Sequence, residues 1–391
     1  MAITLFFFCQ GGSFFLPWAI RNELIIMDIN AFSAILPNIE QIPQPDAFFQ
    51  TVKEQYPQHL QEGYFLPARS PSFYIQRIKT STNTYTGFIA AVSLGAYLNG
   101  EIKGHEETLT RKAQIQTELL EERQALIKPV LVTYPNVSAI DTLVQTQWQA
   151  KAPIQEVYFE ADKTQYQLWE INDAEILAAF KTLFEQHIQS VYIADGHHRI
   201  LSASSSRLGL EQVVCAFYPY SEVMIRDFNR LVTSALPLDE YLLKALEKIA
   251  TIQPLVAGRK PKQKHELTFY YQQQWYSLKW KELHQLIKKL SLPLLDTQLL
   301  DEYILQDLLG IKDVRTTSNV TYIDGLQSIA TIEKQVESQL HDSIAFCLYP
   351  VDRAEMATWA DAGKTLPPKS TWFEPRMKNG IIVQEIQLRN G

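Results

Sequence analysis

The sequence predicts an α+β fold with mixed β-sheets. Two stretches in which apolar and polar residues alternate on both sides of a polar turn predict hairpins, and apolar runs that follow helical segments predict further strands. The chain has 391 residues, of which 46% are hydrophobic, so it is long enough for two domains with cores of their own. We expect a boundary near residue 236, between a domain over 27–235 and a smaller C-terminal α/β portion over 236–391.

Predicted strands and helices alternate along the first half of the N-terminal domain. A hairpin is predicted over 70–102, with its turn in the polar segment 80–86. A helix is predicted over about 106–127, because this segment lacks Gly and Pro and places apolar residues three and four apart. A strand over 129–134 and a helix over 140–150 follow.

Predicted strands and helices also alternate along the second half of this domain. A second hairpin is predicted over 154–172, and a helix over 173–188 has an Asp at its N-cap position. The chain then enters a strand over 189–194, a helix over 198–210 and a strand over 212–220.

Two elements are predicted beyond residue 236. The segment 259–283 has the pattern of an isolated, polar-faced hairpin, and 294–311 that of a helix. No internal repeat or low-complexity segment is present in the sequence.

Charge and cysteine content narrow the partners and the compartment. A formal net charge of −7 and a pI near 5.7 argue against general attraction to nucleic acid or to an anionic membrane, so we expect a small-molecule partner. Cys9, Cys215 and Cys347 lie far apart without a CxxC pair, which predicts neither a disulfide framework nor a thiolate metal site. A reducing cytoplasm is the expected location.

The first 26 residues resemble a signal peptide only briefly. They lack a basic start, and Gly11, Gly12 and Pro17 interrupt their apolar runs. We expect residues 1–26 to be a non-native or disordered extension from an upstream start codon, with the folded domain beginning at Met27. A membrane-associated leader is the alternative.

The stretch "VYIADGHHRILSAS" carries the densest chemistry. A strand that ends at Ala194, an Asp-Gly turn and a helix that begins near His197 direct the N–H groups of a helix N-terminus at one spot, which favours anions. Arg199 adds a forked donor for phosphate, Asp195 can cap the helix, and Gly196 lies in the turn.

The two adjacent histidines of this stretch are not expected to share a ligand. Consecutive helical residues point about 100° apart, so His197 and His198 do not form a zinc pair as histidines at i and i+4 do. At most one imidazole is expected to join Asp195 and Arg199, as base, acid or phosphate ligand. The alternative is a capped turn whose histidines satisfy buried carbonyl groups.

A second cluster lies in "NGEIKGHEETLTRK", where His105 and Glu106 are expected at a helix start, followed by Arg111 and Lys112. Glu107 is available as a capping carboxylate. Acidic residues in a first helical turn are stabilised by the helix dipole, so ordinary capping is the alternative to a catalytic role.

A third cluster lies in "AGKTLPPKSTWFEPRMKNG". Its "GKT" resembles the end of a P-loop, but Thr358 stands where the motif needs glycine, and Pro367 and Pro368 prevent the helix that must follow. A proline-stiffened surface loop is the alternative to a phosphate site. Four side chains remain candidate phosphate ligands: Lys364, Lys369, Ser370 and Thr371.

These stretches together resemble DUF1015, a family of bacterial and archaeal proteins. The resemblance is carried by "GHEET" at 104–108, "YIADGHHR" at 192–199, "LLDTQLLDEYILQDLLGI" at 294–311 and "AGKTLPPKSTWFEPRMKNGIIV" at 362–383. The chain departs from the family pattern near its start, where "AILPNIEQI" replaces a PPYDV-like stretch. The "DGHHR" element is also similar to the signature of the ParB/sulfiredoxin-like fold, which includes an ADP-dependent free serine kinase.

The resemblance implies a ParB/sulfiredoxin-like domain that binds a nucleotide, ADP or ATP, with Mg²⁺ bridging its phosphates. It also implies that Glu106 or Asp195 acts as base toward a substrate hydroxyl, so the expected function is nucleotide-dependent phosphoryl transfer to a small hydroxylated metabolite. The catalytic residues expected on this basis are Glu106, Asp195, His197 and His198. The expected nucleotide ligands are Gly196, Arg199, Lys369, Ser370 and Thr371.

Two other functions stay open at this point. One is a regulator that binds a nucleotide and switches a protein partner without catalysis; a helix-turn-helix with basic flanks would favour its ParB-like form, and the sequence contains none. The other is a divalent-metal hydrolase with His105, Glu106, Asp195 and one histidine of the "DGHH" as ligands.

Overall fold

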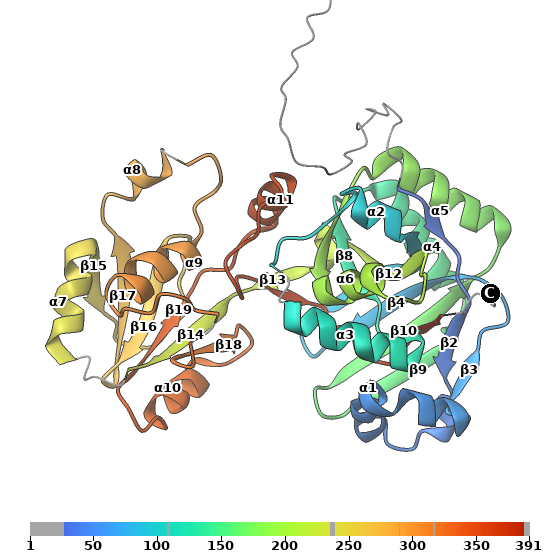
Figure 1. Cartoon of the computed structure of the whole chain (residues 1–391), viewed down its shortest axis with the longest axis horizontal. Coiled ribbons are helices and arrows are strands. Elements are labelled where there is room, and N and C mark those ends of the chain that lie inside the picture. The colour runs from blue at the N-terminus through green and yellow to red at the C-terminus, as the bar shows by residue number, and fades with distance from the viewer. Residues whose placement is uncertain (1–26, 108–109, 235–238, 289, 316, 387–391) are drawn as a thin grey trace, which may run out of the picture.

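The computed structural model describes residues 27–107, 110–234, 239–288, 290–315 and 317–386, which form two lobes (Figure 1). The larger lobe contains a nine-stranded mixed sheet and a four-stranded sheet, and the smaller contains a six-stranded sheet. The predicted α+β fold with mixed sheets is therefore confirmed. The prediction for residues 1–26 lies outside the described residues. In the described ranges no helix is both long and apolar enough to cross a membrane.

The nine-stranded sheet is the core of the larger lobe. Its strands run in the order β6-β11-β8-β12-β5-β4-β10-β9, and β1 also pairs with β5. The pairs β6/β11 and β8/β12 are parallel and the others antiparallel. These strands are β1 (Ile29–Asn30), β4 (Phe73–Lys79), β5 (Thr84–Ser93), β6 (Ile102–Lys103), β8 (Val130–Tyr134), β9 (Gln155–Phe159), β10 (Thr164–Ile171), β11 (Val191–Asp195) and β12 (Gln212–Pro219).

Both predicted hairpins of this lobe are confirmed. β4 pairs with β5 from Lys79 opposite Thr84, and β9 pairs with β10 from Phe159 opposite Thr164. The central β8 is buried along its whole length, because both faces of the sheet are covered.

Helices cover one face of this sheet. α5 begins at the predicted cap, where Asp173 accepts hydrogen bonds from the N–H groups of Glu175 and Ile176. α3 starts later than predicted and ends before a short strand, and residues 108–109 of the predicted helix lie outside the described part. The helices on this side are α2 (Leu94–Leu98), α3 (Thr110–Arg123), α4 (Ser138–Ala150), α5 (Ala174–His187) and α6 (His197–Ser205).

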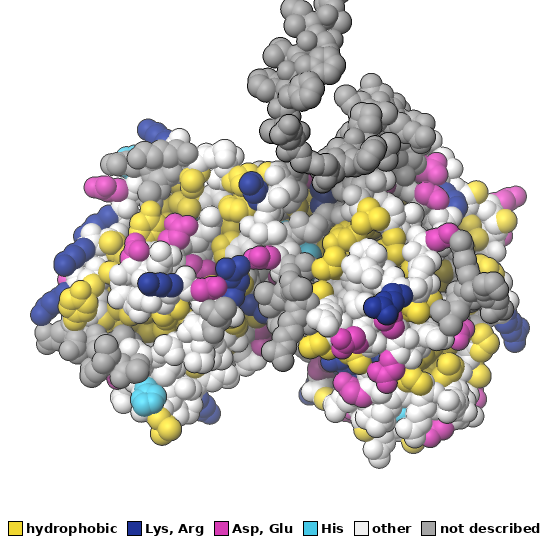
Figure 2. Space-filling model, in the orientation of Figure 1, with side chains coloured by type: hydrophobic (Ala, Val, Ile, Leu, Met, Phe, Trp, Pro, Cys, Tyr) yellow, Lys and Arg dark blue, Asp and Glu magenta, His cyan; other side chains and the backbone are white. Residues whose placement is uncertain are grey.

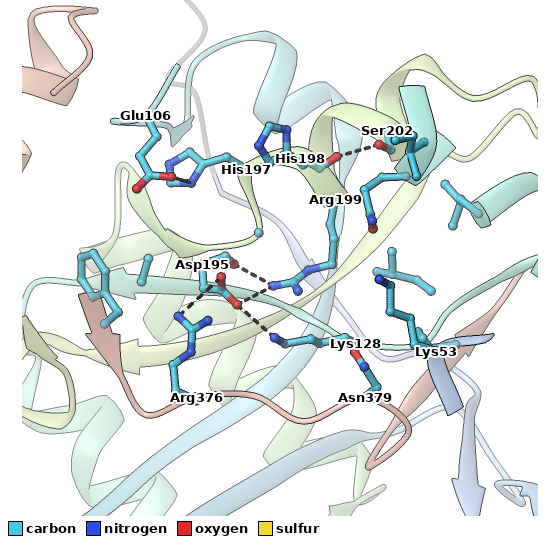
Figure 3. Close-up of a pocket in the computed structure, with 18 of the residues that line it drawn as sticks. Lys53, Glu106, Lys128, Asp195, His197, His198, Arg199, Ser202, Arg376 and Asn379 are labelled. Atoms are coloured by element: carbon cyan, nitrogen blue, oxygen red, sulfur yellow. Dashed lines mark hydrogen bonds and ion pairs between the residues drawn. The ribbon is translucent and has the colours of Figure 1, made fainter. Parts of the chain in front are cut away.

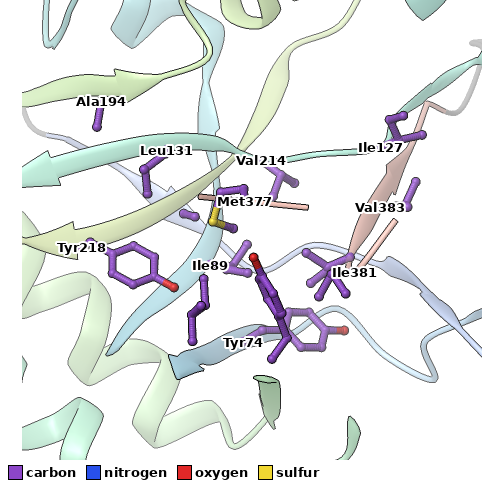
Figure 4. Close-up of a cluster of buried hydrophobic side chains, with 14 of the residues drawn as sticks. Tyr74, Ile89, Ile127, Leu131, Ala194, Val214, Tyr218, Met377, Ile381 and Val383 are labelled. Atoms are coloured by element: carbon purple, nitrogen blue, oxygen red, sulfur yellow. The ribbon is translucent and has the colours of Figure 1, made fainter. Parts of the chain in front are cut away.

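The other face of the large sheet is packed with segments from both ends of the chain. Met377, Ile381 and Val383 from the C-terminal segment lie against Leu131 and Val214 of the sheet (Figure 4). β21 pairs with β2 and β7, which holds this segment in the larger lobe. The elements on this side are β2 (Ala34–Pro37), η1 (Ile39–Gln41), α1 (Pro45–Gln61), β3 (Phe65–Pro67), β7 (Ala125–Leu126) and β21 (Val383–Glu385).

The smaller lobe is built on an antiparallel sheet in the order β15-β17-β16-β19-β14-β18. α7 and the α9–η3 segment pack on one face and α10 on the other (Figure 1). Its elements are β14 (Phe228–Thr233), α7 (Asp239–Ile249), β15 (Ala250–Pro254), β16 (Glu266–Tyr271), β17 (Gln274–Trp280), α8 (Leu283–Ile287), α9 (Asp296–Leu299), η3 (Leu300–Gln306), β18 (Val320–Asp324), α10 (Ile329–Glu337) and β19 (Ser343–Cys347).

The hairpin predicted over 259–283 forms, but it is neither isolated nor polar-faced. All six residues of β16 are buried, because β16 also pairs with β19 and β17 pairs with β15. The sequence pattern fails here because the partners that bury this hairpin are distant in the chain.

Two segments connect the lobes. β13 leads into β14, and β20 returns from the smaller lobe and pairs with β13. α11 lies between the lobes (Figure 1). The connecting elements are η2 (Tyr220–Glu222), β13 (Met224–Arg226), α11 (Arg353–Asp361) and β20 (Trp372–Glu374). The domain boundary near residue 236 stays a prediction.

Candidate functional site

A cavity of about 430 Å³ opens at the N-terminal end of α6 (Figure 3). Its wall comes from α1, the segment around α3, the β7–β8 connection, the β11–α6 turn, and the loop on both sides of β20. Phe228 of β14 adds a contribution from the smaller lobe. The three sequence clusters therefore meet at one cavity, although they are far apart along the chain.

A glycine in the left-handed region turns the chain from β11 into α6. Gly196 has a φ of 114° and is the N-cap residue of α6, and a Cβ at this position would lie 2.6 Å from Arg199 Nη2. Another residue is strained at this φ and would also displace the guanidinium. The prediction that Asp195 caps the helix is wrong, because α6 has no side-chain cap and the Asp195 carboxylate faces cations instead.

Three cations surround the Asp195 carboxylate. Asp195 Oδ2 lies 3.0 Å from Arg199 Nη2 and 3.2 Å from Lys128 Nζ, and Oδ1 lies 3.8 Å from Arg376 Nη1 (Figure 3). Burial alone raises the pKa of Asp195, but Arg199, Lys128 and Arg376 outweigh burial and hold this pKa well below its usual range. Asp195 is therefore ionised and holds the three cations together.

The protonation of the Lys128 amine is sensitive to a further charge in the cavity. Burial, followed by the charge of Arg199, lowers the pKa of Lys128 to about 8, although Asp195 opposes this shift. An anion in the cavity would stabilise the charged ammonium and raise this pKa again.

The cavity wall carries an excess of positive charge. Among the described residues of the wall only Glu106 and Asp195 are acidic, which leaves this part a formal charge of +4 in a chain of net charge −7. On the face drawn in Figure 2, by contrast, side chains of both signs are interspersed. The cationic side chains of the wall are Lys53, Arg123, Lys128, Arg199, Lys369 and Arg376.

Two guanidinium groups of this wall each have a nitrogen donor without an acceptor in the described ranges. Arg123 Nη2 and Arg199 Nε are buried and have no hydrogen-bond partner within the described ranges. A buried donor without an acceptor costs about 1–3 kcal/mol, and more when it is charged. These two N–H groups therefore favour an anionic ligand in the cavity.

His197 is a neutral ring between two segments of the site. Its Nε2 accepts the backbone N–H of His105 at 3.2 Å, so Nδ1 carries the proton and faces Glu106 Oε2 at 3.7 Å (Figure 3). Burial, aided by the charges of His198 and Arg199, lowers the pKa of His197 to about 4. The ring of His197 thus lies beside the Glu106 carboxylate, which is 34% exposed.

Both histidines of the motif line the cavity, where the sequence predicts at most one imidazole at the site. Each ring occupies a different part of the wall, since the cavity extends around the start of α6 (Figure 3). His197 faces Glu106, whereas the wall near His198 includes Ser202 of the next turn.

His105 joins the "GHEE" segment to the C-terminal loop. Its ring is fully buried, stands perpendicular to that of His197 at 4.7 Å between centroids, and lies with Nε2 3.1 Å from Thr371 Oγ1. Its carbonyl accepts the N–H of Leu366 at 2.8 Å. Burial, then the charge of His197, lowers the pKa of His105 to about 3, so this ring is neutral and structural.

The C-terminal loop places only part of its predicted ligands in the cavity. Lys369 and Thr371 line it. Ser370 is buried and faces away from the cavity, with its hydroxyl 3.0 Å from Thr297 Oγ1 and 2.7 Å from Pro367 O, because the chain turns at Lys369, which has a φ of 55°. The structure also leaves Lys364 exposed and outside the cavity wall.

Arg230 of β14 fixes this loop from the smaller lobe. Its side chain is completely buried; Nη1 donates to Lys369 O at 3.1 Å and to Phe228 O at 2.9 Å, and Nη2 donates to Pro368 O at 3.1 Å. Burial raises the pKa of the neighbouring Asp301 to about 6, against the opposing attraction of Arg230. The position of Lys369 in the cavity therefore depends on a buried residue of the other lobe.

The residues of the site do not fit a metal ion held by the protein. No group of three or more His, Cys, Asp or Glu side chains in the described ranges could hold one. Of the ligands predicted for a metal hydrolase, Asp195 faces three cations and His105 contacts Thr371. For Mg²⁺ the wall offers one carboxylate that is not held by cations, Glu106, so phosphate and water oxygens would have to supply the other ligands.

Comparison with protein families shows to which family the chain belongs. The model described as "Protein of unknown function (DUF1015)" matches residues 21–301, which is more than half of the chain. This chain belongs to the DUF1015 family. The match includes the "GHEET" and "YIADGHHR" motifs, whereas the motif at 362–383 lies beyond it. No curated protein matches the sequence.

Solved structures similar to this DUF1015 chain are distant. A free serine kinase mutant in complex with ADP has 13% identity and a TM-score of 0.39, over 77% of this chain and 92% of that one. SbnI with a C-terminal truncation from Staphylococcus aureus has 12% identity and a TM-score of 0.40, over 74% and 85%. A conserved hypothetical protein from Pyrococcus furiosus has 13% and 0.37, over 77% and 96%. At these scores the likeness transfers no activity.

Several wall residues of the DUF1015 cavity were not predicted as site residues: Lys53, Arg123, Lys128, Arg376 and Asn379. Two of them had a signal in the sequence. Lys128 interrupts an apolar run directly before a proline, and Arg376 lies within the third cluster. A charged residue inside an apolar run is costly to bury and is therefore a useful indication of a site.

Proposed function

We propose that this DUF1015 protein binds a nucleotide through its phosphate groups in the cavity and transfers a phosphoryl group from it to a hydroxyl of a small metabolite. The observation that carries the proposal is the pair of buried, unpartnered guanidinium donors on Arg123 and Arg199 in a wall of formal charge +4. Phosphate oxygens are the acceptors that suit such forked donors.

The first turn of α6 supports phosphate at the same place. The first N–H groups of a helix have no acceptor within the helix, and the helix dipole favours negative charge there. Gly196 and His197 belong to the cavity wall, so the phosphates would lie between this turn and the cations around Asp195.

Glu106 is the better candidate for the base. Asp195 is held ionised by three cations and its oxygens face them, whereas Glu106 lines the cavity, is partly exposed and lies beside the neutral ring of His197. In the proposed step the acceptor oxygen attacks the terminal phosphorus, the bond from phosphorus to the leaving nucleotide oxygen breaks, and the hydroxyl proton passes to Glu106. Lys128 and Arg199 neutralise charge on the leaving oxygen.

The rest of the nucleotide has room in this cavity. A volume of about 430 Å³ lies within the usual range for ligand sites, and Leu120, Leu126 and Phe373 give the wall an apolar part. The cations of the wall are proposed to neutralise the phosphates directly.

We also propose that the protein works in a reducing cytoplasm. Cys215 and Cys347, the cysteines in the described part of the chain, are buried and free.

Thermal unfolding with ATP, ADP, CTP and GTP tests the proposal, with adenosine as the ligand that lacks phosphate. We expect at least one nucleotide to raise Tm and adenosine to have no such effect. Arg123→Gln should weaken nucleotide binding about 10- to 100-fold, the loss expected for one charge-assisted hydrogen bond. The matched control is Arg69→Ala, an exposed arginine outside the cavity. If none of the four nucleotides shifts Tm of the intact protein, the proposal is wrong.

A further inference from the structure

A second cavity, of about 320 Å³, lies at the opposite end of β8 from the first. Lys128, which precedes β8, lines the first cavity, and Tyr134, which ends β8, lines the second. At the usual rise per strand residue these positions are about 20 Å apart, so the cavities are separate. The wall of the second comes from α4, η2 and the facing parts of β5, β8 and β12, elements of the larger lobe in Figure 1.

Two carboxylates line this second cavity. Glu222 Oε2 accepts the backbone N–H of Thr86 at 2.6 Å. The side chain of Asp141 has no hydrogen bond or ion pair with any residue in the described ranges. Burial raises the pKa of both carboxyl groups, and the charge of Asp141 raises that of Glu222 further. The two groups therefore repel each other and share a need for a cation.

The hydroxyl of Tyr134 lines the same cavity and also lacks a partner. Tyr134 is 1% exposed, and its ring packs edge-on against Phe88 and Phe184 at 6.4 and 5.4 Å between centroids. No other side chain in the described part of the chain donates to its hydroxyl oxygen, so a ligand in the cavity can do so. Burial raises the pKa of this hydroxyl, and the charges of Asp141 and Glu222, which line the same cavity, add to that shift.

The other groups around this cavity leave it negative. Arg77 lies beside the wall, with its guanidinium 3.8 Å from the centre of the Trp148 ring and Nε 3.4 Å from Thr86 Oγ1. One arginine against two carboxylates leaves a formal charge of −1. Val144 and Pro219 give the cavity apolar walls beside the charged end.

We propose that this second cavity binds the ammonium group of a small organic amine. The ammonium donates to Asp141 and Glu222 and to the hydroxyl oxygen of Tyr134, while Val144 and Pro219 contact the carbon chain. A metal ion is disfavoured, because it requires more oxygen ligands than two carboxylates supply and gains nothing from apolar walls. The site is independent of the proposed phosphate site.

Butylammonium is a suitable probe, and butanol is its uncharged counterpart of similar size. Saturation-transfer NMR on the full chain should detect bound butylammonium and no bound butanol, and a titration gives Kd. Asp141→Asn should weaken binding at least about tenfold, as expected for the loss of one charge-assisted hydrogen bond. Tyr134→Phe, which removes only the hydroxyl, should weaken binding by a smaller factor.

A matched variant separates the site from general effects of core tyrosines. Tyr56 is also 1% exposed with an unpartnered hydroxyl, but it lies in α1 outside both cavities, so Tyr56→Phe should leave the Kd for butylammonium unchanged. Asp141→Asn and Tyr134→Phe should not lower Tm of the free protein, because each removes an unsatisfied or repelled group. This keeps the binding test separate from a folding failure.

Four results would overturn the proposal, and three of them concern the ligands. They are the absence of saturation transfer to butylammonium, equal binding of butanol, and displacement of butylammonium by Ca²⁺ at equal concentration, which would assign the cavity to a metal ion. Unchanged binding in both Asp141→Asn and Tyr134→Phe would likewise place the amine elsewhere.

Discussion

Asp195 at the end of β11 and Arg199 in the first turn of α6 face each other, with Oδ2 of the carboxylate 3.0 Å from Nη2 of the guanidinium. The same carboxylate holds Lys128 and Arg376, whose charges would otherwise repel each other and Arg199. Because Asp195 neutralises only one of three cations, the cluster stays positive and is arranged in advance for an anion. Asp195 therefore acts on the cations of the cavity, and the reacting hydroxyl is left to Glu106.

Asp195→Asn tests this role through stability. Removing one partner of a partly buried ion cluster leaves the cations unpaired, and we expect the free energy of unfolding to fall by about 3–5 kcal/mol at neutral pH. The folded-state pKa of Asp195 is depressed, so its stabilisation is present above the unfolded-state pKa and is lost as pH falls through the folded-state value. Urea unfolding of both proteins should therefore show a difference that shrinks on acidification.

The same variant separates a structural carboxylate from a catalytic one. With Asp195 neutral the cavity is more positive, so Asp195→Asn should bind inorganic phosphate at least as tightly as the unmodified protein. Calorimetry under conditions where both proteins are folded gives the two Kd values. Much weaker phosphate binding by the variant would show that the cations need Asp195 for their positions, and that the charge excess alone is not enough.

From the lowered pKa of Lys128 we predict that ligand binding takes up protons. Its pKa of about 8 leaves part of the ammonium deprotonated at pH 8.5, and a bound phosphate raises this pKa, so ADP binding at pH 8.5 should take up protons. The affinity for ADP should accordingly fall as pH rises above 8. Calorimetry in two buffers of different ionisation enthalpy measures the uptake. Lys128→Arg stays charged at this pH and should bind ADP without it; equal uptake in both proteins would contradict the assignment.

Glu106→Gln should abolish phosphoryl transfer and spare nucleotide binding. Loss of a general base lowers a rate about 10²- to 10⁴-fold, whereas the phosphates are proposed to lie at the cations and not at Glu106. Transfer from labelled ATP or ADP to a panel of hydroxylated metabolites, with Kd measured in parallel, checks both halves. Glu107→Gln is the control, since Glu107 is exposed and pairs with Arg315. Nucleotide binding without transfer to any acceptor would favour the regulator over the enzyme.

The parts of the fold that could be predicted are those that depend on neighbouring residues. The hairpins over 70–102 and 154–172 are confirmed because their turns and alternation are local. The segment 259–283 formed its hairpin but not its predicted environment, since β19 and β15, which bury it, come from distant parts of the chain.

The site, too, has a part that could be predicted from neighbouring residues and a part that could not. The strand-turn-helix around Gly196 could be predicted from adjacent residues, and its position at a cavity agrees with that reasoning. Lys128 and Arg376 were missed because the pairing of β8 with β11 and the return of the C-terminal segment bring them to Asp195. The role of Asp195 changed from cap to ion partner for the same reason.

We predict that Arg230, a buried residue of the smaller lobe, controls nucleotide affinity at the cavity of the larger lobe. Its guanidinium bonds the carbonyl groups of Pro368 and Lys369, and so holds the Lys369 ammonium and the Thr371 hydroxyl at the cavity. Lysine has one charged centre and cannot span both carbonyl groups, so Arg230→Lys should release the loop. We expect a weaker affinity for ADP together with a lower Tm.

Lys369→Ala separates these two effects. It removes the cation from the cavity but leaves the backbone carbonyl that Arg230 binds, so it should weaken ADP binding with little change in Tm. If Arg230 acts by positioning Lys369, the loss in affinity from Arg230→Lys and Lys369→Ala should be less than additive in the double variant. Fully additive losses, measured by calorimetry on folded proteins, would mean that Arg230 supports the fold of the smaller lobe without positioning the loop.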